Sequence, residues 1–367
     1  LAIIALLLIM GGFGWWQWQR SQQISQVQAD LSVMKVDFET AQAQATENPI
    51  QARDSLLRIQ DQLDALSQSY QSKPVALAEI GEFETEVNQA YDEVSGRKEL
   101  QELPVFFTIS DIESRFIGSD WALAGSNMWI LDRDAKQVLR FNIQEKTGQV
   151  FSLSQEQADS AGQLQSLALL GSDQESAADS IILGNEVLRV SSETGEITTL
   201  VEATSELEGA RIMNAYGTNI YVFKADRQNI FRIAVEDGDA GTPRSWIRSS
   251  QGIQFNQVQS MTIDGDIWLG DREGNIVRMS TGTPEAFTIT GLETPFSSAV
   301  TLYTREEFEH IYVLEAASNR LVVLNKDGSF VKEVVSASLA SVTSLIVSED
   351  EQTAFALSGT LIYQLDL

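Results

Sequence analysis

From residue 105 onward, apolar residues recur in one short pattern, and four of its six copies carry an arginine at the third position. The copies are Val138–Phe141, Val187–Val190, Ile230–Ile233, Ile276–Met279, Leu321–Leu324 and Leu361–Leu365. Each copy follows the previous one by about 40–50 residues, which is the spacing of β-propeller blades.

Each copy belongs to a larger set of strands. A second apolar strand precedes it, and the intervening aspartate, asparagine and glycine residues tolerate the tight backbone of a hairpin. These preceding strands are Trp129–Asp132, Ile181–Gly184, Tyr221–Lys224, Trp268–Asp271, Tyr312–Glu315 and Ala354–Leu357. Another strand comes first in each set, as at Val258–Ile263 and Val342–Val347. The strands expected to complete the sets include Gln149–Leu153, Glu196–Val201, Ala286–Thr290 and Phe330–Val335. Four antiparallel strands make one blade.

The last set lacks its fourth strand, because the sequence stops at Leu367. A spare strand, Val105–Ser110, stands directly after Pro104. Pairing this strand with the last blade would close the ring and remove an unpaired edge. The pattern therefore predicts an all-β, six-bladed propeller over residues 104–367.

The first residues have a different pattern. An uncharged apolar run opens at Leu1 and ends in Trp15, Trp16 and Trp18, just before Arg20. The run is about as long as a bilayer requires, and tryptophan favours the membrane interface. A signal peptide and a buried helix are the alternatives, but neither a basic leader nor a small-residue cleavage site is visible. We expect residues 1–19 to form a transmembrane helix, in a chain that is part of a longer protein.

The flanking charges predict the orientation of that helix. Lys35 is the one basic residue in the thirty positions after Arg20. Since basic residues collect on the cytoplasmic side, the rest of the chain is expected outside the cytoplasm. The expected location is a bacterial cell membrane, crossed once.

Residues 20–103 show helical spacing, with prolines at positions 49 and 74 as breaks. The apolar stripes are Ile24, Val27, Leu31, Met34, Phe38 and Ala41, then Leu56, Ile59, Leu63, Leu66 and Tyr70, then Leu77, Ile80, Phe83, Val87, Tyr91 and Val94. They predict a coiled-coil stalk, built as a three-helix bundle or as a helical hairpin on a long first helix. The stripes serve either mutual packing or a homodimer that transmits a signal.

Charge and composition narrow the function. The net charge of −27 repels phosphate backbones, so nucleic-acid binding is not expected. Cysteine is absent, which excludes disulfides and cysteine-ligated zinc. The one histidine, His310, has no second histidine with which to share a metal, and we assign it to solvent or a local hydrogen bond. The sequence predicts no catalytic, cofactor-binding or metal-ligating residue.

Several charged groups nevertheless repeat. Arg140, Arg189, Arg232 and Arg278 share one position in the blade, which favours ion pairs between blades over a ligand-binding ring of arginines. Asp132, Asp271 and Glu315 recur where the second strand ends, and we expect them to cap turns or to pair with the arginines.

Other acidic segments are candidates for binding. Asp237–Gly241 and Asp264–Asp266 superficially suggest calcium but lack the spacing of a calcium loop, so hairpin turns are favoured and calcium stays open. The insertions Ser172–Ser180 and Glu236–Pro243 lengthen loops that either bind a ligand or are simply solvated.

Two resemblances add expectations. His310–Phe330, and less closely Asp266–Arg278, resemble NHL repeats, which implies a six-bladed platform that binds ligands or proteins, with some hydrolases and lyases among its relatives. The layout, with Glu102–Ser110 and Gly209–Val222, resembles the extracytoplasmic half of bacterial single-pass proteins that carry a PPM-type phosphatase domain before the membrane helix. That phosphatase domain is absent from this sequence.

The leading hypothesis is a membrane-anchored, extracytoplasmic binding or sensor module for a protein, peptide or glycan. One alternative is a hydrolase or lyase whose divalent cation is held by carboxylates in the propeller channel. The other is a structural scaffold of the cell envelope. Acidic and amide side chains converging on the ring axis would favour the enzyme.

Overall fold

The computed structural model describes residues 24–46, 48–171 and 178–367. The chain divides into two compact units, with the boundary between Lys98 and Glu99. The predicted transmembrane segment, residues 1–19, lies outside the described residues. Within the described ranges, no helix combines the length and apolarity needed to cross a membrane.

The described residues of the first unit form three helical stretches: residues 24–44, α2 (Pro49–Ser69) and α3 (Pro74–Ser95). Each break has a local cause. The Asn48 side chain accepts a hydrogen bond from the Gln51 N–H, and a proline occupies the first turn of both α2 and α3. Gly96 ends α3 in the left-handed conformation that glycine adopts at low cost.

The predicted apolar stripes form the core of this unit. The buried members are Val27, Leu31, Phe38, Ala41, Leu56, Ile59, Leu63, Tyr70, Ile80, Phe83 and Val87, joined by Ala76 and Ala90, which were not predicted. The predicted Met34, Leu66, Leu77, Tyr91 and Val94 are partly buried against them. Phe38 and Phe83 meet edge to face, with ring centroids 5.5 Å apart. The three-helix arrangement is confirmed, and its apolar seam is buried within a single chain.

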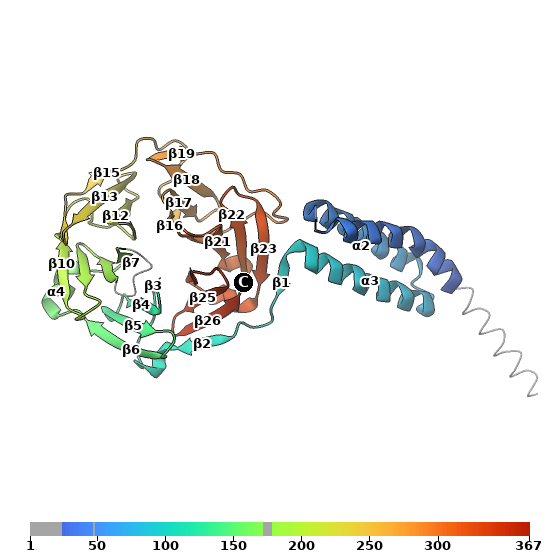
Figure 1. Ribbon diagram of the computed structural model, residues 1–367, viewed down its shortest axis with the longest axis horizontal. Coiled ribbons are helices and arrows are strands. Elements are labelled where there is room, and N and C mark those ends of the chain that lie inside the picture. Colours follow the sequence, from blue (N-terminus) through green and yellow to red (C-terminus); the bar gives the residue numbers. More distant parts are fainter. Residues whose placement is uncertain (1–23, 47, 172–177) are drawn as a thin grey trace, which may run out of the picture. The chain divides into compact units, whose positions relative to one another are not determined.

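The described residues of the second unit form six antiparallel sheets arranged around an axis (Figure 1). The first blade has β3 (Asp120–Ala124), β4 (Asn127–Asp132), β5 (Gln137–Asn142) and β6 (Thr147–Ser152). The second has β7 (Ser166–Leu170), β8 (Asp179–Leu183), β9 (Val187–Val190) and β10 (Ile197–Val201). The third has β11 (Ile212–Tyr216), β12 (Asn219–Lys224), β13 (Asn229–Glu236), β14 (Asp239–Ala240) and β15 (Arg244–Ser245).

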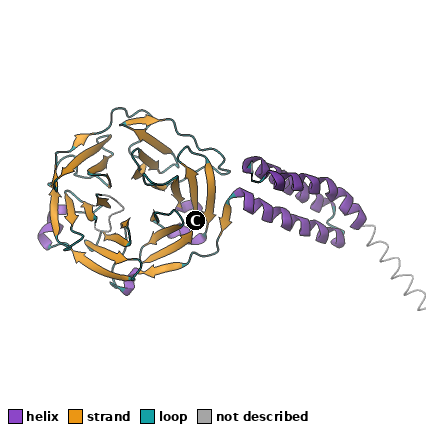
Figure 2. Ribbon diagram, viewed as in Figure 1, coloured by secondary structure: helices purple, strands orange, loops and turns teal. Residues whose placement is uncertain are grey.

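The fourth blade has β16 (Val258–Ile263), β17 (Ile267–Asp271), β18 (Ile276–Ser280) and β19 (Thr283–Glu285). The fifth has β20 (Thr301–Tyr303), β21 (His310–Glu315), β22 (Arg320–Asn325) and β23 (Phe330–Val335). The sixth has β24 (Ser344–Val347), β25 (Thr353–Ser358), β26 (Leu361–Asp366) and β2 (Val105–Thr108). Strand β1 (Arg97–Glu99) lies at the boundary of the two units, and four short helices, η1 (Ile109–Asp111), α4 (Gln155–Ala161), η2 (Ala316–Ser318) and η3 (Ala337–Ser341), join strands of the ring (Figure 2).

The core lies between blades. Since successive side chains of a strand point to opposite faces, each strand packs against both neighbouring blades. In β4, Trp129 and Leu131 join the cluster shared with the second blade, whereas Met128 and Ile130 join the cluster shared with the sixth. Each blade therefore needs a neighbour on both sides.

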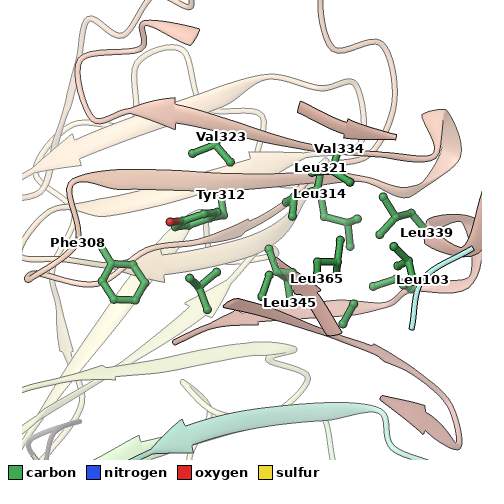
Figure 3. Packing of buried hydrophobic residues seen from close by; sticks show 14 residues of the cluster. Leu103, Phe308, Tyr312, Leu314, Leu321, Val323, Val334, Leu339, Leu345 and Leu365 are labelled. Carbon is green, nitrogen blue, oxygen red and sulfur yellow. The ribbon is translucent and has the colours of Figure 1, made fainter. Parts of the chain in front are cut away.

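The ring closes as predicted. Strand β2 pairs with β26 and brings Val105 opposite Tyr363 and Thr108 opposite Leu361. Leu103, just before β2, packs into the apolar cluster between the fifth and sixth blades (Figure 3). The six-bladed propeller is thus confirmed.

One predicted strand is wrong. The fourth strand of the fourth blade is β19, not Ala286–Thr290. Thr281 and Gly282 both have positive φ and turn the chain immediately after β18, so the hairpin closes earlier than the apolar pattern indicates. Residues Ala286–Thr290 instead continue toward a single bridge between Thr290 and Ser329.

A buried ion pair ties the fourth-to-fifth blade connection to the fifth blade. Arg320 Nε lies 2.7 Å from Glu315 Oε2, and the Glu315 side chain has an exposure of 0%. Glu315 Oε1 also accepts hydrogen bonds from the backbone N–H groups of Ser297 and Ser298. Burial acts to raise the pKa of Glu315, but these hydrogen bonds and the Arg320 guanidinium outweigh it and lower the pKa below its usual value.

We expect Glu315→Gln to lower the free energy of unfolding by about 3–5 kcal/mol, because Arg320 would lose the closer of its two buried carboxylate partners and keep only Glu333, at 3.5 Å. Urea unfolding of both proteins measures this loss. Since the pKa of Glu315 is lowered in the folded state, its stabilisation should be present at neutral pH and should fade as the pH drops below about 4.5. The control is Glu273→Gln, which changes an exposed carboxylate in a hairpin of the fourth blade. Equal unfolding energies for the two variants would contradict this account.

Candidate functional site

The repeated arginines pack on the residue directly opposite in the neighbouring strand. Arg140 faces Trp129 and Arg278 faces Trp268, with the guanidinium carbon 5.7 and 5.3 Å from the ring centroids. Arg232 faces Tyr221 in the same register. The repeat thus places a cation against an aromatic ring on the face of several blades.

The predicted ion pairs between blades are wrong in detail. Arg278 pairs with Asp266 at 2.6 Å, and Arg189 pairs with Asp179, in each case within one blade. The hydrogen bond that Arg140 makes to the next blade goes to the carbonyl oxygen of Ser192. None of these arginines lines the central channel described below, because the third strand lies away from the axis. These four arginines therefore do not form a ring around the channel.

Two of the three recurring carboxylates cap turns, which is one of the two roles expected, whereas Glu315 pairs with Arg320 and not with a repeated arginine. Asp132 Oδ1 accepts hydrogen bonds from the N–H groups of Asp134 and Ala135, and its Oδ2 accepts one from Ile117. Asp271 Oδ1 accepts in the same way from Glu273 and Asn275.

Asp237 and Asp264 also lie in tight turns between strands, which confirms the hairpin interpretation of these acidic segments. Asp237 has positive φ between β13 and β14, and Asp264 accepts a hydrogen bond from the N–H of Asp266. Of the two insertions, Glu236–Pro243 extends the third blade through β14. Most of Ser172–Ser180 lies outside the described residues.

His310 makes the local contact predicted for it. Its Nδ1 lies 2.8 Å from Glu351 Oε2, which also accepts a hydrogen bond from the Tyr312 hydroxyl. Glu351 Oε1 accepts from the Glu309 N–H. This contact joins the fifth and sixth blades.

The inner strands of the six blades line a central channel of about 480 Å³. Side chains connect neighbouring blades along its wall. Asp120 Oδ2 accepts hydrogen bonds from the Ser166 hydroxyl and the Leu167 N–H, and the Ser166 hydroxyl also lies within hydrogen-bonding distance of the Met213 carbonyl. Asn214 donates to the Met261 carbonyl in the next blade. The wall is polar because these side chains satisfy backbone groups of the adjacent blade.

Arg305 occupies the end of the channel where the inner strands finish. Its Nη2 donates to the Leu123 carbonyl of the first blade, and its Nε donates to the Tyr303 hydroxyl. The residue is 7% exposed. Nearby, Lys326 pairs with Asp264 at 3.0 Å. This end of the channel is held by side chains that reach across blades.

The opposite end opens into a second depression of about 720 Å³, which we call the side pocket. The channel and the side pocket share Arg133, Arg211, Ile212 and Gln259 as lining residues. Further lining residues of the side pocket are Gln165, Ser205, Glu208, Gly209, Phe223, Lys224, Ala225, Asp226, Arg227, Phe255, Asn256, Val258 and Arg272. The hairpins that follow the second strands of the first, third and fourth blades supply Arg133, Arg227 and Arg272.

The arginines give the side pocket a positive character, whereas the whole chain has a negative net charge. Within the described ranges, no ion pair is formed by Arg133, Arg211, Arg227 or Arg272. At longer range, Arg133 interacts electrostatically with Asp120, and Arg227 interacts electrostatically with Glu206. Asp120 is the one carboxylate among the described lining residues of the channel, against Arg133, Arg211 and Arg305. Among the described residues, no group of three or more metal-ligating side chains gathers.

The sequence pattern did not predict this arginine cluster, although it holds one signal of it. The Asp-Arg pair recurs at Asp132-Arg133 and Asp271-Arg272, where the aspartate caps the turn and the arginine follows. The third-strand arginines form the stronger sequence pattern, because they repeat four times. Which arginines reach the axis depends on the strand order within each blade.

No family model matches the chain, and no curated protein matches it. Solved structures similar to it include a streptogramin B lyase, with 15% identity, a TM-score of 0.50 and coverage of 72% of this chain and 97% of that one. Virginiamycin B lyase from Staphylococcus aureus has 13% identity, a TM-score of 0.46 and coverage of 71% and 87%. A calcium-binding regucalcin from Agrobacterium tumefaciens has 12% identity, a TM-score of 0.48 and coverage of 73% and 94%. At these identities the likeness concerns the fold alone, and nothing in it supports a link to phosphatases.

Burial raises the pKa of the Asp120 carboxyl, and the Arg133 guanidinium and the hydrogen bonds from Leu167 and Ser166 oppose the rise only in part. A carboxyl whose pKa is raised on folding loses stabilisation as the pH climbs above its ordinary value near 3.8. We therefore expect Asp120→Asn to gain stability relative to the wild type between pH 4 and pH 7, as measured by urea unfolding. The exposed neighbour Asp134 provides the control, Asp134→Asn. Parallel pH profiles for Asp120→Asn and the wild type would refute the assignment.

Proposed function

We propose that this chain is a membrane-anchored binding module, and that its propeller recognises a protein or peptide at the joined channel mouth and side pocket. The observation that carries the proposal is that four arginines line this pocket and form no ion pair with any described residue, on a chain whose net charge is −27. Uncompensated like charges at one place oppose folding, so a ligand that neutralises them offers a reason for their presence.

The size and construction of the pocket support this function. Its volume of 720 Å³ lies within the range of ligand sites, and three of its four arginines stand on short hairpins fixed by the blades. The enzyme alternative requires carboxylate and carbonyl oxygens around a divalent cation. The described channel wall instead carries one carboxylate, Asp120, with three arginines, and this balance disfavours a cation. No feature of the described surface favours the scaffold alternative.

The membrane anchor belongs to the same proposal. Its support is the apolar run at residues 1–19 with its terminal tryptophans, and the scarcity of basic residues after Arg20 favours a propeller outside the cytoplasm. Ligand binding outside the cytoplasm would then be transmitted to a cytoplasmic effector through the helical first unit.

A peptide-display selection tests the binding function. The whole chain, held in detergent, should select peptides that bind saturably, and the double variant Arg211→Glu/Arg272→Glu should weaken that binding by more than about tenfold. Arg244→Glu is the matched control, because Arg244 is exposed on β15 and does not line the pocket. Selected peptides that bind both variants as well as the wild type would remove the pocket from the proposal.

The topology has its own test. In cells that produce the chain, external protease added to spheroplasts should cleave the propeller, while a tag placed before residue 1 should stay protected until the membrane is opened. Protection of the propeller in intact spheroplasts would overturn the extracytoplasmic placement.

A further inference from the structure

We infer that the ligand of this site is an acidic peptide segment, whose carboxylates are bound by Arg133, Arg211, Arg227 and Arg272. The inference rests on the proposed function and names the ligand class of the same site. Arginine clusters recognise acidic motifs because the planar guanidinium donates two parallel hydrogen bonds to one carboxylate.

Arg133 provides the most direct indication. Its Nε is buried and has no hydrogen-bond partner among the described residues. A buried donor without an acceptor costs free energy, and native proteins keep few of them. Arg133 lines both the channel and the side pocket, so its guanidinium group is placed to donate to an oxygen of a ligand at their junction.

The acidic neighbours of these arginines are already engaged. Asp132 and Asp271 stand next to Arg133 and Arg272 in sequence, but their oxygens accept backbone hydrogen bonds within the hairpins. The carboxylates of Asp132 and Asp271 thus hold the turns in place, and among the described residues neither forms an ion pair with the arginine that follows it. Lys224 differs, since its Nζ donates to the Glu208 carbonyl and lies 3.3 Å from Asp226.

The spread of the cations favours an extended chain over one compact anion. The four arginines come from hairpins of three blades and from the segment before β11, so several carboxylates along a peptide match them better than a single phosphate does. The amides of Gln165 and Asn256 line the same pocket and suit a peptide backbone.

An anionic glycan fits less well. Sugar rings bind on exposed aromatic faces, whereas Phe223 and Phe255 are 3% and 5% exposed and stack on each other with centroids 5.7 Å apart. The aromatic residues of the side pocket therefore stabilise its floor and offer little face to a sugar.

Fluorescence anisotropy with a labelled hexaglutamate peptide tests the inference on the whole chain in detergent. We expect saturable binding that weakens steeply with added salt, no binding of hexaglutamine, and a loss of more than about tenfold in Arg211→Glu/Arg272→Glu but not in Arg244→Glu. Thermal unfolding of each variant shows that the fold is intact. Arg133→Gln should also weaken binding, whereas a residue with a purely structural role would change the melting temperature and leave the affinity unchanged.

Competition separates the possible sources of negative charge. Inorganic phosphate or an oligogalacturonate that displaces the peptide at lower concentration than unlabelled hexaglutamate would overturn the peptide assignment. Absence of hexaglutamate binding would also overturn it, yet would leave the binding function standing if the display selection yields neutral peptides that depend on Arg211 and Arg272. A selection that yields no peptide at all would count against the binding function itself.

Discussion

Closure of the ring is the constraint on which the rest of the propeller depends. Every blade buries apolar side chains on both of its faces, so no blade is stable without two neighbours. The contact that completes the circle joins the two ends of the unit, with β2 beside β26 and the Gly118 N–H donating to the Gly359 carbonyl. Leu103, just before β2, packs into the apolar cluster between the fifth and sixth blades. The cohesion of all six blades therefore rests on pairing between segments far apart in sequence.

A closed ring also dictates the chemistry of its axis. The six inner strands converge there, and each has a free edge whose backbone groups require partners. Short polar side chains such as Ser166 and Asn214 supply them from the adjacent blade. Asp120 does the same with a carboxylate, which explains why a group with a raised pKa persists in the channel wall. The channel is polar for structural reasons before any ligand is considered.

The position of an arginine within the blade decides what it does. On the third strand, Arg140 and Arg278 lie across from tryptophans, and their guanidinium groups pack on those rings within the fold. One hairpin earlier, Arg133 and Arg272 follow the capping aspartates and reach the pocket at the channel mouth. The same side chain is thus structural at one place and available to a ligand at the other. An acidic chain of this kind gains a local positive site without a change in its overall charge.

The sequence by itself determined the six repeats, the closing strand and the three helical stripes, because each depends on local periodicity or on a countable pattern. It also predicted the turn-capping role of Asp132 and Asp271, since capping is settled within a few residues. The sequence did not predict β19 as the last strand of the fourth blade, because the turn at Thr281 and Gly282 closes the hairpin earlier than the apolar pattern indicates. Only the tertiary structure decided which arginines pair within a blade and which gather at one pocket. That choice depends on residues from four segments meeting around an axis, and no spacing along a single segment records such a meeting.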